Sequence, residues 1–349
     1  ISLGLVGSEM CIRDRKYTAL PSAMSYSGGK LIYSNNPEAI NRKHIGYPLR
    51  NAGKFTIGTT IAKGEVVNFE YYHANYTGGS LQIAVALIND SGNAVKFKVA
   101  REGVASGNVK NTATTSIAAK CNEAFYQSSA RWDTIPNGQT YLVANSGTLA
   151  SDEMANGKVE ISPVDGTLKA RVVFYDPKKN VQTQAASFKR ATDDEKMRTT
   201  ALFRYNHRSI ALNLANNRYN SFLLFPANEI SNWKTFNKGE YPQSASDPIA
   251  GIDGIGTQQI NDAGVTTLDT RWLLLGNYAM IYDLNLSGCN GRKIKFSKPG
   301  KSSGVIMARA NNGTWYAKTL PFTYEASTTS LLQIILIGGN SGDVVMEIL

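Results

Sequence analysis

The sequence predicts a mainly β protein built from two antiparallel β-sandwich domains with one or two short helices. Three observations predict this class. Many short segments alternate apolar and polar residues with a period of two, as strands with one buried face do. The 31 glycines are spread along the chain, where they supply turns. Charged residues make up only 18% of the 349 residues, which excludes a coiled coil and a charge-driven disordered tail.

The clearest strand signal lies in the first half of the chain. Residues 81–87 place Leu81, Ile83, Val85 and Leu87 on one face, and the turn residues 89–93 (NDSGN) follow. Residues 95–99 then alternate valine and phenylalanine with lysine. We therefore predict a hairpin whose second strand is exposed to solvent on one face. The Asp165-Gly166 pair marks another tight turn, before the alternating segment 168–174.

Further strands are expected along the whole chain, at a spacing typical of a sandwich or barrel. They cover residues 54–61, 66–72, 140–144, 203–214, 221–225, 271–275, 279–286, 293–297, 305–309, 314–318 and 331–337.

Two helices and one domain boundary complete the predicted organisation. Residues 116–127 place Ile117, Cys121 and Phe125 on one helical face. A second short helix is expected at 191–198, where Thr192 and Glu195 have the spacing of a capping box. Few large apolar residues lie between 177 and 198, so we predict sandwich domains at 16–180 and 199–349, joined by a linker or long loop at 181–198.

The first fifteen residues are expected to be foreign to the protein. Residues 5–14 (LVGSEMCIRD) resemble the translation of a transposase-type sequencing adapter, so we predict that the natural start, with any export signal, lay upstream. Without Cys11 the body holds Cys121 and Cys289, too few for a metal cluster or a disulfide framework. These two cysteines form either one bridge or two free thiols, one on a helix and one in a turn.

The strongest electrostatic signal is a group of cations that we call the basic strip. The chain has 37 basic and 27 acidic residues, a net charge of +10. Five of the cations fall within ten residues that contain no acid: Arg292, Lys293, Lys295, Lys298 and Lys301. Such a patch attracts polyanions, so we predict that it contacts an anionic cell-wall polymer or surface glycan, without a specific nucleic-acid site. The alternative is an edge strand protected by lysines against sheet-to-sheet aggregation.

Candidate catalytic motifs are weak. Residues 300–304 (GKSSG) fit the nucleophile-elbow pattern, but both flanks are predicted strands, so a polar hairpin tip explains them better. His44, His73 and His207 have no metal-ligand spacing. The acidic groups at 152–153 and 193–195 are expected to be solvated charge. We therefore predict no catalytic residue, metal site or cofactor.

The aromatic residues leave two interpretations open. The chain has 17 tyrosines, and its four tryptophans are Trp132, Trp233, Trp272 and Trp315. An exposed row of such rings would form a sugar-stacking platform, whereas most aromatic residues on short strands belong to a core.

Several segments are similar to a family of β-rich envelope proteins of Gram-positive, Firmicutes-type bacteria. They are 31–38 (LIYSNNPE), 72–75 (YHAN), the strand 81–87 with Asn89, 92–93 (GN), 103–104 (GV), 135–138 (IPNG) and 275–282 (LGNYAMIY). Members of that family often carry a copper-amine-oxidase-like stalk domain. Ala279 stands where the family usually has glycine. The resemblance implies export and attachment near a thick cell wall, and it implies no reaction.

These observations favour a non-catalytic, secreted or wall-associated structural or binding protein. A carbohydrate-binding or adhesion module is one alternative. A hydrolase is another, and it requires His73 or His207 to meet a carboxylate and a hydroxyl in one cleft. Assembly into fibres through an open sheet edge stays open, as does the oligomeric state. The longest strongly apolar stretch, 331–337, is far shorter than the roughly 20 residues that cross a bilayer, so no membrane span is expected.

Overall fold

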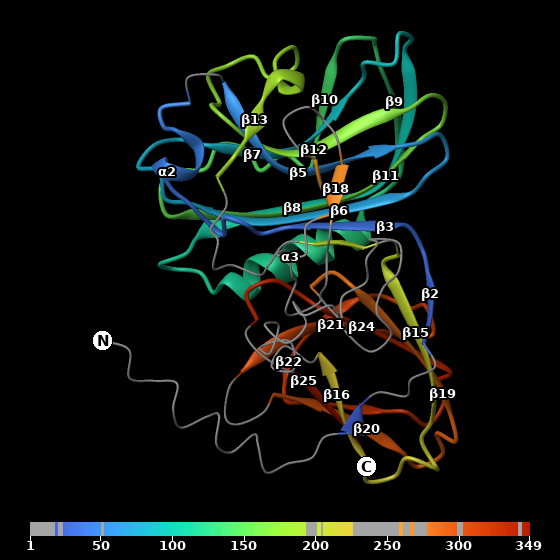
Figure 1. The fold of residues 1–349 in the computed structure, drawn as a ribbon. Helices are drawn as coiled ribbons and strands as arrows, with labels where there is room; N and C mark the ends of the chain where they lie inside the picture. The colour runs from blue at the N-terminus through green and yellow to red at the C-terminus, as the bar shows by residue number, and fades with distance from the viewer. Residues whose placement is uncertain are drawn as a thin grey trace.

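The computed structural model is mainly β, with several sheets, two α-helices and one 3-10 helix in the part of the chain that it describes (Figure 1). The mainly β class and the expectation of one or two short helices are confirmed. The structure describes residues 18–19, 24–49, 52–192, 201–203, 205–225, 258–260, 266–268, 278–298, 303–340 and 344–349. The predicted segments 1–15 and 271–275, and residues 193–198 of the second predicted helix, lie outside these ranges.

Two sheets, which we call sheets 1 and 2, share a hydrophobic core in the upper part of Figure 1. Ile83 and Val172 of sheet 1 meet Phe69 and Ile161 of sheet 2 there, and all four are fully buried. Sheet 1 has the strand order β10 (Thr140–Val143), β7 (Gln82–Ile88), β12 (Leu168–Tyr175), β5 (Gly53–Ile61) and β13 (Lys189–Arg190). Sheet 2 has the order β14 (Ala201–Phe203), β3 (Lys30–Ser34), β6 (Val67–Asn75), β11 (Glu153–Pro163), β8 (Val95–Asn108) and β9 (Arg131–Ile135), with β4 (Ala39–Ile40) paired to β6.

Sheets 3 and 4 lie in the lower part of Figure 1 and share a second core, to which Leu284 and Ile334 of sheet 3 and Phe296 and Met346 of sheet 4 belong. Sheet 3 has the order β2 (Met24–Ser27), β15 (His207–Asn213), β19 (Ile281–Ser287), β24 (Leu331–Leu336), β21 (Gly304–Ala310) and β22 (Tyr316–Leu320). Sheet 4 has the order β1 (Thr18–Ala19), β16 (Ser221–Phe225), β25 (Val344–Ile348), β20 (Lys293–Ser297) and β23 (Phe322–Glu325). A separate pair is formed by β17 (Gln258–Ile260) and β18 (Thr266–Leu268).

Helix α3 (Thr114–Gln127) lies between sheets 2 and 3 (Figure 1), and it confirms the predicted helix at 116–127. Its buried face carries Ile117, Cys121 and Phe125, as the spacing predicted. The helix backbone approaches sheet 2 so closely that a Cβ on Gly103 would lie 2.4 Å from the Cys121 carbonyl oxygen. The absence of a side chain at Gly103 therefore allows α3 to pack closely against β8. Helix α2 (Arg42–Ile45) is a single turn that the sequence did not predict.

The predicted hairpin at 81–99 is wrong. β7 pairs with β10 and β12 in sheet 1, whereas β8 pairs with β11 and β9 in sheet 2. The loop between them crosses from one sheet to the other, and Asn89 holds it by donating to the Asn93 and Ile135 carbonyl oxygens. The turn at Asp165-Gly166 also joins strands of different sheets, β11 and β12.

The segment expected as a linker is largely part of the first half. In its described portion it forms a 3-10 helix, η1 (Ala185–Ser187), and β13, which pairs with β5. Val181, Ala185 and Phe188 are buried against the outer face of sheet 1. These side chains are few but well spaced, so they cover a sheet face that would otherwise be exposed.

The strand pairing also crosses the expected boundary between the halves. β2 pairs with β15 of sheet 3, although its residues precede all of sheet 2, and β14 pairs with β3 of sheet 2. The chain therefore passes from sheet 3 to sheet 2 at residues 28–29, and it enters sheet 3 again after residues 205–206. In the ranges that the structure covers, neither α-helix has the length and hydrophobicity needed to cross a bilayer.

Candidate functional site

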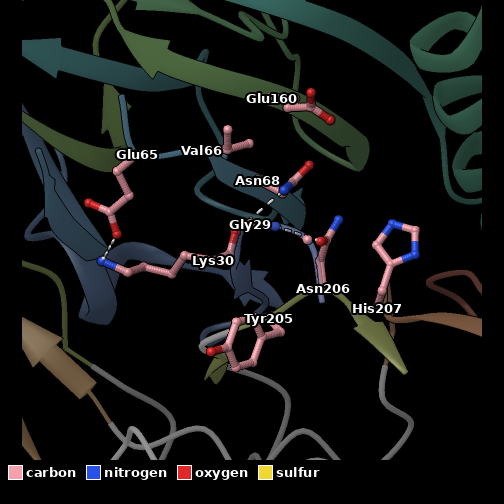
Figure 2. A pocket seen from close by; sticks show the side chains of 10 residues that line it. Gly29, Lys30, Glu65, Val66, Asn68, Glu160, Tyr205, Asn206 and His207 are labelled. Carbon is pink, nitrogen blue, oxygen red and sulfur yellow. Dashed lines mark hydrogen bonds and ion pairs between the residues drawn. The ribbon is translucent and has the colours of Figure 1, made fainter. Parts of the chain in front are cut away.

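A cleft of about 550 Å³ opens between sheets 2 and 3, at the place where the chain passes between them twice (Figure 2). Seven of the ten residues that line it have polar side chains, and the other three are Gly28, Gly29 and Val66. The polar lining consists of Lys30, Glu65, Asn68, Glu160, Tyr205, Asn206 and His207. Because these side chains come from both sheets, the site exists only when the two halves are packed together.

The mouth of the cleft is held by contacts between the two crossings. The Asn206 side-chain oxygen accepts a hydrogen bond from the Gly29 backbone N–H at 3.0 Å. Gly28 has a φ of +85°, and a Cβ there would lie 2.0 Å from the same oxygen of Asn206. Glycine is thus required at this crossing, both for its backbone conformation and for the space that Asn206 occupies. Lys30 forms an ion pair with Glu65 at 2.7 Å (Figure 2).

Sheet 2 contributes a row of three polar side chains. Glu160 on β11 is the register partner of both Asn68 on β6 and Arg101 on β8. Register partners in an antiparallel pair project from the same face of the sheet, so the three side chains stand beside one another. Among the residues described, the Glu160 carboxylate and the Arg101 guanidinium have no hydrogen-bond or ion-pair partner. Their polar atoms therefore stay available to a ligand.

Sheet 3 contributes a second row, in which hydrogen bonds connect four strands. Ser209, Asp283, Gln333 and Arg309 are successive register partners on β15, β19, β24 and β21. Gln333 donates to Asp283 Oδ1 at 2.5 Å, and Arg309 donates through Nε to the Gln333 side-chain oxygen. Ser209 donates to Asp283 Oδ2 at 3.2 Å. The row fixes the Asp283 carboxylate.

Asp283 in turn orients His207. The His207 Nδ1 atom lies 2.8 Å from Asp283 Oδ2, and because an ionised carboxylate only accepts, Nδ1 carries the proton of this hydrogen bond. In the neutral ring Nε2 is then an acceptor. Burial acts to raise the pKa of the Asp283 carboxyl, but hydrogen bonds from His207, Gln333 and Ser209 hold that pKa below its ordinary value. Asp283 therefore stays ionised near neutral pH.

A smaller pocket of about 140 Å³ continues inward from the cleft, and we call it the inner pocket. It shares Asn68, Glu160, Asn206 and His207 with the cleft. Its other polar side chains are three cations, Arg101, Lys158 and Arg309, and its aromatic wall is Phe125 and Tyr126 at the end of α3.

The cations of the inner pocket lie against aromatic rings. Arg101 lies 5.7 Å from the centre of the Tyr126 ring, and Lys158 lies 5.5 Å from it. Arg309 lies 4.8 Å from the centre of the Trp315 ring, which stacks on Tyr126 at 4.8 Å. Burial raises the pKa of the Tyr126 phenol, while the positive charges of Lys158, Arg101 and Arg309 lower it. The three cations thus surround one aromatic pair.

Among the residues that the structure describes, Lys158 is the one cation of the inner pocket that forms an ion pair. Lys158 lies 3.1 Å from the Glu70 carboxylate and donates to the Asn122 side-chain oxygen at 2.9 Å. Both charged side chains are almost completely buried. Burial acts to lower the pKa of Lys158, but the negative charge of Glu70 raises it above its ordinary value. Arg101 and Arg309 are left as uncompensated guanidinium groups.

The structure places the basic strip very differently. Its lysines Lys293 and Lys295 form ion pairs with Glu325 at 2.6 Å and with Glu347 at 3.0 Å, on the neighbouring strands. Lys298 is buried, and Lys301 lies outside the described residues. Arg292 is half-buried at the start of β20. The alternative interpretation as a protected edge strand is wrong, because β20 has β25 on one side and β23 on the other.

The other two histidines lie away from the cleft. His44 caps α2, where its Nδ1 accepts from the Asn41 backbone N–H at 3.2 Å. His73 is completely buried; its Nδ1 lies 2.7 Å from the Pro37 carbonyl oxygen and its Nε2 lies 2.9 Å from the Ser34 hydroxyl. Burial lowers the pKa of His73 to about 3, against a weaker opposing effect of the Pro37 hydrogen bond. His73 is a structural residue of the core.

The remaining candidates do not come together as a site. Asp152 forms an exposed ion pair with Lys110, and Glu153 accepts from the Ala150 backbone N–H. β21 follows the GKSSG segment, whose residues 300–302 lie outside the described ranges, so the helix that an elbow needs is replaced by a strand. β20 and β21 belong to different sheets, so the predicted hairpin tip is wrong as well. Cys121 and Cys289 are both free thiols, which confirms the second of the two interpretations.

The aromatic residues are divided between core and surface. Trp315 is buried, whereas Trp132 on β9 and Tyr316 on β22 are each 56% exposed. These exposed rings lie on different sheets, so within the described ranges they make no continuous platform. Trp233 and Trp272 lie outside those ranges. Within the described residues, no three histidine, cysteine, aspartate or glutamate side chains lie close enough together to hold a metal ion.

Comparison with known proteins identifies no relative. No family model matches the chain, and no curated protein sequence matches it. Among solved structures, hazelnut (Corylus avellana) vicilin is 7% identical with a TM-score of 0.15, over 85% of this chain and 82% of that one. Oxalate decarboxylase from Lactobacillus farciminis is 9% identical with a TM-score of 0.13, over 93% and 86%, and the Bacillus subtilis enzyme is 8% identical with a TM-score of 0.13, over 93% and 76%. Similarity at this level carries no argument about fold or function.

Proposed function

We propose that the protein is a non-catalytic binding protein of the bacterial envelope, and that it holds a carbohydrate chain in the cleft between sheets 2 and 3. The observation that carries this proposal is the polar lining of the cleft. Asn68 and Asn206 offer amide groups, Glu160 offers an unpaired carboxylate, and His207 offers Nε2.

The chemistry of these groups suits sugar hydroxyls. A hydroxyl both donates and accepts, so it needs donors and acceptors side by side, which amide and carboxylate side chains supply. The cleft volume of about 550 Å³ lies within the range of about 300 to 1,000 Å³ that is usual for small-molecule sites. A cleft that is open to solvent also suits one segment of a longer polymer.

The envelope location and the domain architecture belong to the same proposal. The location is supported by the resemblance of the segments at 31–38, 72–75 and 275–282 to secreted envelope proteins. The architecture is two β-sandwich units, sheets 1 and 2 in one and sheets 3 and 4 in the other, and the two shared cores support it. In this arrangement the ligand lies at the junction of the units.

Calorimetric titration of the whole protein with neutral and acidic oligosaccharides tests the proposal. We expect binding by at least one of them, and we expect Glu160→Gln to weaken it by about tenfold, because a charged hydrogen-bond acceptor is lost. Glu325→Gln is the matched control, since Glu325 is a carboxylate outside the cleft. Equal affinity of the Glu160→Gln variant and the wild type for every saccharide that binds would show that the cleft is not the site.

A hydrolase is the second candidate, and the pairing of His207 with Asp283 at the cleft favours it. The pair has the form of a general base held by a carboxylate. However, the Ser209 hydroxyl donates to the same Asp283 oxygen as His207, so it lies on the Asp283 side of the ring and not at Nε2. Release of reducing ends from a saccharide that binds, abolished by His207→Gln and retained by Glu325→Gln, would establish the hydrolase in place of the binding protein.

A further inference from the structure

We infer that the inner pocket is a subsite for an anionic group, so that the ligand of the cleft is an acidic saccharide bearing a carboxylate or a phosphate. This inference rests on the proposed function, and it adds the chemical class of the ligand. It begins from Arg101 and Arg309, two guanidinium groups that face one small pocket of about 140 Å³ from opposite sheets.

The two guanidinium groups are positioned without using most of their donors. Arg101 rests on the rings of Phe125 and Tyr126, at 5.8 and 5.7 Å, and it has no hydrogen-bond acceptor among the residues described. A ring face holds a guanidinium in place but takes none of its five N–H donors. In the hydrogen bonds among the described residues, Arg309 donates only through Nε, to the Gln333 side-chain oxygen. Donors therefore remain on both side chains for a planar or tetrahedral oxyanion.

The two arginines of the pocket form no ion pair among the described residues, even though acids lie near them. Lys158 is neutralised by Glu70 at 3.1 Å, and His207 is held by the Asp283 carboxylate. Glu160 faces both the cleft and the inner pocket, and among the described residues it forms no ion pair with either arginine. Burial and repulsion from Arg101 lower the pKa of Arg309, against opposing effects of Tyr126 and Asp283, so the two arginines repel each other. A bound anion would relieve that repulsion.

The position of the pocket decides how the ligand would be oriented. Asn68, Glu160, Asn206 and His207 line both spaces, so the inner pocket adjoins the cleft. The hydroxyls of the saccharide would meet these four side chains, and its anionic substituent would point inward to the arginines. Arginine is suited to this role because its planar fork binds carboxylate or phosphate through two parallel hydrogen bonds.

The test uses probes that differ only in charge. The first pair is an oligogalacturonate and the same oligomer with its carboxylates methyl-esterified, and a glycerol phosphate oligomer is the phosphate probe. In calorimetric titrations of the whole protein we expect an acidic probe to bind at least about tenfold more tightly than the neutral ester. Carboxylate and phosphate as the source of the anion are distinguished by which of the two acidic probes binds.

The variants then locate the effect. Arg101→Gln should remove the preference for the acidic probe, Arg309→Gln should reduce it, and Arg101→Lys should keep part of it, because the charge remains while the fork is lost. Lys293→Gln is the matched control, a loss of one cation in the basic strip. Thermal unfolding of each variant identifies any that is not folded, and Arg101→Lys keeps the test valid if Arg101→Gln fails.

The outcomes separate the inference from the function on which it rests. If neither acidic probe bound the wild type more tightly than the neutral ester, the anionic subsite would be overturned while a carbohydrate-binding cleft would remain. A preference that survives in Arg101→Gln and is lost in Lys293→Gln would also overturn it. Absence of binding by every saccharide would overturn the proposed function itself.

Discussion

Two regions of the molecule carry clustered positive charge, and they differ in what surrounds the cations. In the basic strip, Lys293 and Lys295 are neighbours in sequence, and each meets a glutamate on an adjacent strand of sheet 4. In the inner pocket, Arg101 and Arg309 are separated by 208 residues in the sequence, yet they face one space between sheets 2 and 3. The lysines of the first cluster form ion pairs across the sheet, whereas the arginines of the second form none among the described residues, although Glu160 is the register partner of Arg101.

The difference teaches that charge density along a chain is a poor guide to charge density in space. A strand has register partners on both sides, so its charge is decided by residues far away in the sequence. For Lys293 the partner is Glu325, whereas for Arg309 it is the neutral Gln333. The potential that a ligand meets is therefore set by strand pairing, and it is the inner pocket that presents free guanidinium donors.

The largest expected effect comes from removing Lys158, the paired cation of the inner pocket, and it is an effect on stability. Lys158→Met should lower the free energy of unfolding by about 3 to 5 kcal/mol, because it leaves the Glu70 carboxylate buried without a partner. Urea unfolding measures the change. The double variant Glu70→Gln with Lys158→Met should recover part of the loss, and a single variant as stable as the wild type would contradict the buried ion pair.

The free energy of unfolding should depend on pH through the buried histidine His73. The pKa of His73 is about 3 in the folded protein and about 6.5 when unfolded, so between these values only the unfolded chain binds the proton. Its contribution to stability is complete above about pH 6.5 and is lost as the pH falls toward 3. We expect the wild type to lose about 1.4 kcal/mol more per pH unit than His73→Asn between pH 6 and 4. Parallel stability curves for the two proteins in that range would refute this prediction.

The carboxylate that holds His207 gives a smaller effect at lower pH. Because the pKa of Asp283 is held below its unfolded value of about 3.9, its stabilisation is present above that pH and is lost as the pH falls through the folded pKa. We expect Asp283→Asn to be less stable than the wild type by about 1.5 kcal/mol at pH 7, with a difference that shrinks below pH 4. Urea unfolding at pH 7, 4 and 3 measures it, and a constant difference would be evidence against the depressed pKa.

The smallest effect belongs to the basic strip. Lys293 and Glu325 are both more than half exposed, and exposed ion pairs contribute about 0 to 1 kcal/mol. Lys293→Gln should therefore change the free energy of unfolding by less than about 1 kcal/mol, and it should leave retention on purified cell walls unchanged across a salt series. A marked loss of retention in this variant would return the polyanion contact to the basic strip and remove the contrast between the two regions.

Strand positions could be predicted from the sequence, but sheet membership could not. The alternation at 81–87 and 95–99 correctly indicated two strands, and it indicated which residues face a core. Both strands face the same core from opposite sides, and a period of two is identical in the two arrangements. The loop at 89–93 is short enough for a hairpin, yet its hydrogen bonds hold a crossing between sheets.

The site was predictable only in part, for a related reason. His207 stood out as a rare histidine, but Asp283, Gln333 and Arg309 join it through the register of four strands. One signal is present in the sequence: Gln333 interrupts the otherwise apolar segment LLQIIL, and Asp283 lies between Tyr282 and Leu284 in IYDLNL. A polar residue within such a strand needs a buried partner, and here the partners build the cleft.

The double passage of the chain between sheets 2 and 3 ties the assembly of the two halves together. The first half of the sequence contributes β2 to sheet 3, and the second half contributes β14 to sheet 2. A fragment that ends at residue 192 would keep β2 without β15, and one that begins at residue 205 would carry β15 with an open edge, ready to pair with any foreign strand. Cutting the molecule in two would therefore leave sheets 2 and 3 incomplete, and it would separate the residues that line the cleft.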